Sequence, residues 1–204
     1  MKTRYTVVLM SVLAMLVMAG EANAQMGKRM YMNIGWQFNA PIGNDFVNKA
    51  QGYGAYIQNG YYVTPLLAIG TFSAFGTNNE YYPKQTYKLP NEAAVTTDLD
   101  RSIYQTPFGA SVRMRCSWGP FQPYLEAKIG TEYSTQSIYM SNFVSRVSNW
   151  GFYVSPEIGF NYYPFPKDDI GIHVAAYYSY STNHHDSFGI QGLNNLGFKI
   201  GVAF

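Results

Sequence analysis

The chain has 204 residues, of which 13% are charged, and its formal net charge at pH 7 is +2. A charge so close to neutral gives no support for nucleic-acid binding, which depends on clustered basic residues. The composition includes 19 Tyr, 13 Phe and 19 Gly, which favours strands over soluble helices. The single cysteine, Cys116, excludes an intramolecular disulfide.

Residues 1–24 have the organisation of a secretory signal peptide. Two basic residues precede a run of apolar residues, and Ala22 and Ala24 form an Ala-x-Ala cleavage motif. The alternative, a membrane-spanning helix, needs about 20 consecutive apolar residues, and this run is shorter. The sequence therefore predicts an exported chain whose mature domain spans residues 25–204.

Beyond the signal peptide, no stretch is apolar for long enough to form a spanning helix, so a membrane-embedded chain would have to cross as strands. Residues 31–40 alternate an apolar face with a polar face, which is typical of a strand between lipid and a lumen. The alternation continues over 53–63, where Asn59 interrupts the apolar face. A turn at 64–66 leads into a strand over 67–76 whose two faces the pattern does not distinguish.

The rest of the chain repeats this alternation. Further strands are expected at 104–116, 123–133, 150–162, 170–180 and 195–204. Three connections are short: 64–66, 117–121 and 163–169. Four are long and polar and are expected to be loops: 41–52, 77–102, 134–149 and 183–194. Short and long connections alternate in even-stranded barrels whose two termini lie on the side of the short turns. The sequence therefore predicts an all-β fold, an eight-stranded antiparallel up-and-down transmembrane β-barrel. A soluble secreted barrel, the alternative fold, would require polar outer faces.

The end of the chain carries apolar residues at alternate positions: Phe198, Ile200, Val202 and Phe204. Together with GYYVTPLLAIG (60–70), QPYLEAKIG (122–130) and VSPEIGFNYYP (154–164), this ending resembles the small outer-membrane β-barrel family of diderm bacteria, the OmpA/OmpX/OmpW-like eight-stranded barrels of the porin-like superfamily. The resemblance covers essentially all of the mature chain. It implies contact with outer-membrane lipid, both termini in the periplasm, and recognition of the last strand by the barrel-assembly machinery.

Seven charged residues are predicted to face the interior: Arg113, Arg115, Glu126, Lys128, Glu132, Glu157 and Lys199. The interior of an eight-stranded barrel is just wide enough for its own side chains, so these groups are expected to pair with one another and fill the lumen. Lys199 is expected to pair with Glu126, Glu132 or Glu157. The alternative is a polar path for small solutes or ions, gated by rearranged pairs.

Two further features bear on chemistry and on strand structure. The sequence His184-His185-Asp186-Ser187 contains the residue types of a hydrolase triad or a metal site, but adjacent strand residues point to opposite faces and two histidines lack the third zinc ligand. We therefore expect no catalytic residue, metal or cofactor. His173 is expected to face inward beside Glu157 as a hydrogen-bonded filler. Pro156 cannot donate a ladder hydrogen bond, so a bulge or a missing bond is expected there.

Three classes of function remain. The favoured class is a non-enzymatic outer-membrane protein whose loops, 77–102 in particular, contact an extracellular ligand or surface or support envelope integrity. A narrow channel and a lipid-modifying enzyme are the alternatives. A filled lumen would favour display over conduction, whereas a histidine, a hydroxyl and a carboxylate within hydrogen-bond reach at the outer rim would favour the enzyme.

Overall fold

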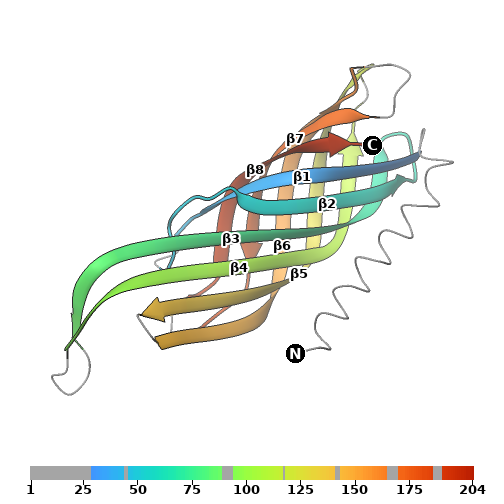
Figure 1. The fold of residues 1–204 in the computed structure, drawn as a ribbon. Coiled ribbons are helices and arrows are strands. Elements are labelled where there is room, and N and C mark those ends of the chain that lie inside the picture. The colour runs from blue at the N-terminus through green and yellow to red at the C-terminus, as the bar shows by residue number, and fades with distance from the viewer. Residues whose placement is uncertain are drawn as a thin grey trace, which may run out of the picture.

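The computed structural model describes residues 29–43, 46–88, 94–116, 118–140, 143–164, 170–185 and 190–204. Eight strands, each antiparallel to the next, form a sheet that closes where β8 pairs with β1 (Figure 1). The strands are β1 (Met30–Pro41), β2 (Tyr53–Tyr62), β3 (Leu67–Lys88), β4 (Ala94–Arg115), β5 (Phe121–Met140), β6 (Phe143–Tyr162), β7 (Gly171–Ser181) and β8 (Leu193–Ala203). This is the predicted up-and-down barrel. The predicted signal peptide, 1–24, lies outside the described residues.

Side chains alternate between the lumen and the exterior along the strands. Large apolar side chains cover the outside, as with Trp36 and Ile158, which are 67% and 61% exposed. In β3, whose facing the sequence left open, Phe72 points into the lumen and Ile69 points out. An exterior of this kind fits lipid and rules out the soluble alternative, which needs polar outer faces. Of the residues described, none belongs to a helix long and apolar enough to cross a membrane.

The barrel has two unlike ends. The turn end carries the short connections 63–66, 116–120 and 163–170, and the loop end carries the connections 42–52, 89–93, 141–142 and 182–192. The first residues of β1 and the last residues of β8 also lie at the turn end, because Met32 and Phe204 exchange two backbone hydrogen bonds there. The predicted alternation of connections is therefore present, although two of the expected long loops differ.

Residues 77–102 and 134–149 were expected to be loops, and this prediction is wrong for their described parts, 77–88, 94–102, 134–140 and 143–149. β3 and β4 stay paired out to Lys88 and Ala94, and β5 and β6 stay paired out to Met140 and Phe143. These hairpins extend well past the loop-end limits of the other four strands (Figure 1). We call this extension the projecting sheet (78–88, 94–103, 134–140 and 143–149). The prediction failed because polar composition marks where a strand leaves lipid, whereas backbone pairing continues in water.

Two loop-end connections fold against the inner side of the projecting sheet. Phe46 and Val47 from the first connection and Ile190 from the last pack with Leu193 of β8 and Ile103 of β4. All five side chains are buried. They form an apolar cluster at the loop end of the lumen, which we call the apolar cap.

Pro156 interrupts one of the two ladders of β6. Its pairing with Ala127 on β5 is regular, but the ladder to β7 breaks at Ser155 and Pro156 and then resumes in the same register. This confirms the predicted missing bond, without a bulge. The Ser155 hydroxyl donates to the Tyr178 carbonyl, at an Oγ–O distance of 2.7 Å. In this register Tyr178 lies opposite Pro156, so the hydroxyl replaces the absent proline N–H. Pro107 breaks the β3–β4 ladder in the same way.

We expect Ser155→Ala to lower the free energy of unfolding by about 1–3 kcal/mol, because it leaves a carbonyl in the barrel wall without a donor. The matched control is Ser148→Ala, whose exposed hydroxyl on the projecting sheet bonds to the Thr135 hydroxyl and to no other described side chain. Its expected effect is within about 0.5 kcal/mol. Urea unfolding in lipid vesicles measures both variants, and equal effects would contradict the role given to Ser155.

Candidate functional site

The lumen is the candidate site, because it gathers most of the buried polar and charged side chains of the described residues. Three levels follow one another from the turn end to the loop end. The first is the charge layer, built on Arg113, Glu126, Lys128, Glu157 and Lys199. The second is a polar level around Glu132, whose hydrogen-bond partners are uncharged, and the third is the apolar cap.

Arg113 and Glu126 form the first ion pair of the charge layer. They lie directly opposite each other on β4 and β5, with both side chains fully buried. Nη2 and Nε of the arginine are 2.6 and 2.9 Å from Oε2 of the glutamate. The guanidinium carbon also lies 3.8 and 3.9 Å from the ring centroids of Tyr31 and Tyr124. The two rings stabilise the cation at a position buried from solvent.

Glu157 on β6 is the centre of the second cluster. One of its oxygens, Oε2, pairs with both Lys128 on β5 and Lys199 on β8, the latter at 2.7 Å. The other oxygen, Oε1, accepts hydrogen bonds from Gln58 Nε2 on β2 and from the Tyr124 hydroxyl, each at 2.9 Å. A single carboxylate therefore links strands from opposite sides of the lumen. Breaking such a buried cluster strands uncompensated charge.

His173 extends this cluster through two tyrosines. Its Nδ1 bonds to the Tyr56 hydroxyl, and its Nε2 lies 2.5 Å from the Tyr124 hydroxyl oxygen. The Tyr124 proton is donated to Glu157, so the Tyr124 oxygen accepts from Nε2–H. The network therefore places a proton on Nε2, and in the neutral imidazole Nδ1 accepts from Tyr56.

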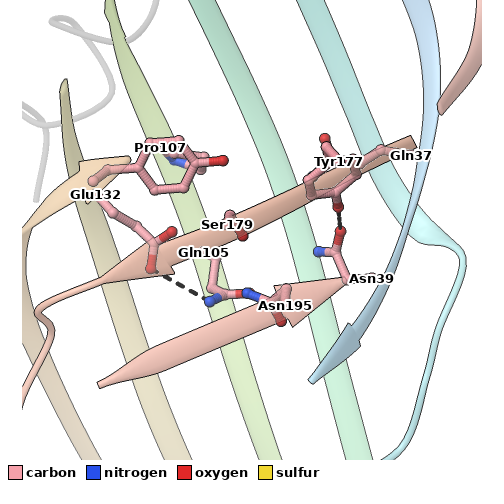
Figure 2. Close-up of a pocket in the computed structure, with 9 residues that line it drawn as sticks. Gln37, Asn39, Gln105, Pro107, Glu132, Tyr177, Ser179 and Asn195 are labelled. Atoms are coloured by element: carbon pink, nitrogen blue, oxygen red, sulfur yellow. Dashed lines mark hydrogen bonds between the residues drawn. The ribbon is translucent and has the colours of Figure 1, made fainter. Parts of the chain in front are cut away.

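Glu132 lies closer to the loop end and contacts neutral donors. Its Oε1 accepts from Ser181 Oγ at 2.8 Å and from Gln105 Nε2 at 3.3 Å. Within the described part of the chain, no cation forms an ion pair with it. A cavity of about 10 Å³ lies beside it, and Tyr177 donates to Asn39 at its other side (Figure 2). That volume holds about one water molecule, so the level is closely packed.

Of the seven charged residues singled out in the sequence, the structure brings five together in the charge layer. Arg115 lies apart, half-buried at the turn end, where it donates to the Pro65 carbonyl and stacks on Tyr62 at 3.5 Å. Glu132 lies apart on the loop side. Sequence reasoning missed the neutral partners Gln58 and Tyr124, although both occupy the polar face of their strands and could have been found by the same alternation.

The residues proposed as an assembly signal lie on or beside the last strand. Phe198, Ile200 and Val202 point outward and are exposed, while Phe204 is partly buried beside Met32. Their recognition by the barrel-assembly machinery stays a prediction.

The histidine motif of the last loop lies only partly within the described residues. His184 accepts a hydrogen bond from Asn149 at its carbonyl, and the His185 backbone pairs with Ile190. Asp186 and Ser187 lie outside the described residues. Where side chains are described, no group of three His, Cys, Asp or Glu residues has the arrangement to hold a metal ion.

Replacing the two interior glutamates separately should have unequal effects. Glu157→Gln leaves two buried ammonium groups without a carboxylate, so the free energy of unfolding should fall by about 3–5 kcal/mol. Glu132→Gln keeps the shape and an acceptor oxygen and breaks no ion pair, so its effect should be below about 1 kcal/mol. Urea unfolding in lipid vesicles compares them, and a larger loss for Glu132→Gln would contradict the assigned pairing.

The proton position on His173 is also testable. Nitrogen-15 NMR of the histidine-labelled barrel in lipid nanodiscs should show the Nε2–H tautomer, and Tyr124→Phe should shift the Nε2 resonance by removing its partner. A dominant Nδ1–H tautomer would contradict the direction of the hydrogen bonds from Tyr56 to Glu157.

Comparison with known proteins matches a family model, described as the outer membrane protein beta-barrel domain, to residues 7–204. Among solved structures, Neisserial surface protein A is 18% identical, with 85% of this chain and 95% of that chain covered and a TM-score of 0.57. The outer membrane protease OmpT from Escherichia coli is 9% identical over 86% of this chain and 96% of its own, with a TM-score of 0.52. Ail, the attachment invasion locus protein of Yersinia pestis, was solved with the heparin analogue sucrose octasulfate; it is 15% identical over 86% and 98%, with a TM-score of 0.48.

No curated protein matches the sequence. The structural neighbours have different functions, and at these identities they show a shared fold. The family match covers almost the whole chain, including every strand of the barrel and the residues of the lumen. This chain therefore belongs to the outer membrane protein beta-barrel family and is a barrel of the bacterial outer membrane.

Proposed function

We propose that the protein is a non-enzymatic display barrel, which holds the projecting sheet outside the cell for contact with an extracellular ligand or surface. The observation that carries this proposal is the projecting sheet itself. Four paired strands continue beyond the closed barrel. The lumen below them is filled by the charge layer, the polar level around Glu132 and the apolar cap. In the orientation we propose, both termini lie in the periplasm and the loop end faces outward.

The packed lumen argues for display over conduction. The charge layer joins strands across the barrel through Glu157, and the apolar cap adds a second obstruction at the loop end. The cavity between them has room for about one water molecule. A solute path would require both levels to open, which would break buried ion pairs.

The projecting sheet has the surface of a contact element. Tyr81 and Phe143 are 57% and 64% exposed on strands that lie beyond the barrel. On the side of β3 that faces away from β4, the Gln51 side chain bonds to the Asn79 backbone and covers the edge. Beyond Tyr82 the pairing of β3 with β4 shifts register. The edge of β6 from residue 143 to 148 has no strand partner among the described residues. An open edge can accept an extended segment of another molecule.

The proposed absence of catalysis rests on how the reactive side chains are used. Both ring nitrogens of His173 are bonded to tyrosine hydroxyls, and Glu157 accepts from four side chains. Glu132 lies beside a hydroxyl of Ser181, and its other partner is an amide. These groups are committed to structure, which supports display over a lipid-modifying or proteolytic activity.

Cells carrying a shortened hairpin test the proposal. Replacing residues 135–148 by Asn-Gly joins Ser134 to Asn149, which are paired in the parent hairpin, through a two-residue turn and removes the open edge of β6. We expect attachment to glycan- or protein-coated surfaces to fall to the level of cells lacking the protein. Sensitivity to vancomycin and detergent should stay unchanged, which separates surface contact from envelope integrity.

The control measures conduction on the full-length protein. Planar bilayers containing the wild type or Lys199→Ala should show no unitary current steps. Current steps in the wild type that change with Lys199→Ala would show that the protein is a channel and would overturn the display proposal. Unchanged attachment by the shortened variant would refute display through the projecting sheet.

A further inference from the structure

A polar patch interrupts the apolar exterior of the barrel wall on β2 and β3. It consists of Asn59, Thr71 and Ser73, which all point away from the lumen. Asn59 lies beside Thr71 in the β2–β3 ladder, and Ser73 lies beside Ile57. Followed across the next strands in register, the level of Thr71 continues through apolar residues: Ala110, Ile129 and Val154. The polar patch is therefore a local departure on one side of the barrel.

The patch lies inside the band that faces lipid. On its turn-end side the same two strands expose Tyr61 and Ile69, and on its loop-end side β3 exposes Phe75. Lipid headgroups lie at the margins of such a band, so they do not reach a site flanked by apolar residues in both directions. The neighbours of the patch in the membrane are therefore hydrocarbon chains or another protein.

The hydrogen bonds within the patch leave one group without a partner. The Thr71 hydroxyl donates to Asn59 Oδ1 at 2.9 Å. For the two N–H groups of Asn59 Nδ2, the described residues supply no acceptor within hydrogen-bond distance. Hydrocarbon supplies none either, so a lone barrel carries the cost of an unsatisfied amide in lipid.

We propose that this patch is the interface through which two copies of the chain pair in the membrane. A side-chain amide carries both donors and acceptor lone pairs, so two Asn59 side chains related by a two-fold axis can each donate to the other. The patch is uncharged, which gives no basis for a partner of opposite charge. The small Ala110 beside Thr71 lets two barrel walls approach closely, as small residues do between membrane helices.

Cross-linking in native membranes tests where the copies meet. In a Cys116→Ser background, Asn59→Cys should form disulfide-linked dimers under mild oxidation. The matched control is Ile158→Cys on β6, on the far side of the barrel from β2. This position is also exposed on the outside of the barrel and should stay monomeric. Equal cross-linking of the two variants, or none from Asn59→Cys, would overturn the interface.

A second variant separates the amide from its surroundings. Asn59→Leu places an apolar side chain in lipid, so the barrel should fold and show the usual heat-dependent gel mobility. Its dimer dissociation constant, measured by single-molecule photobleaching over a series of protein-to-lipid ratios, should rise about tenfold because two symmetric hydrogen bonds are lost. An unchanged constant, or a wild type that is monomeric at every ratio, would refute pairing through Asn59.

Discussion

The structure depends on a carboxylate buried at the centre of the lumen. Glu157 holds Lys128 and Lys199 by one oxygen and Gln58 and Tyr124 by the other. Lipid tails are as apolar as the outer side chains, so contact between the exterior and lipid does not favour one arrangement of the strands over another. The interior therefore supplies much of the specificity with which the barrel closes. A hydrogen-bonded ion cluster that joins strands from opposite walls supplies this specificity, because the buried charges are compensated only when all of these strands are in place.

The lumen also explains why the barrel is suited to hold a rigid surface. The charge layer closes the turn-end half, and the apolar cap packs Phe46 and Ile190 against the inner side of the projecting sheet. Arg101 adds a contact of the same kind, with its guanidinium 5.3 Å from the Phe46 ring. The sheet outside the membrane therefore continues a packed core, which limits its motion relative to the barrel.

Much of this fold is predictable from alternation alone, because lipid and lumen impose opposite polarity on neighbouring residues. That rule placed Lys199 inward and Trp36 outward. It also placed Pro156 inside a strand, where the lack of a proline N–H predicted the missing bond. It failed at the loop end, where 77–88 and 94–102 lie in a segment rich in polar residues and yet remain paired. It also could not choose a partner for Lys199, because pairing across the lumen depends on strand tilt and register, which no single strand encodes.

The central claim is that Glu157 and Lys199 are coupled inside a closed lumen. A double-mutant cycle with Glu157→Gln and Lys199→Met, followed by urea unfolding in lipid vesicles, measures this coupling directly. The account predicts that the two changes are far from additive, with an interaction energy of about 1–3 kcal/mol that persists in high salt because the pair is buried. Additive effects, or a coupling that disappears in salt, would show that the two groups meet water and that the lumen is open.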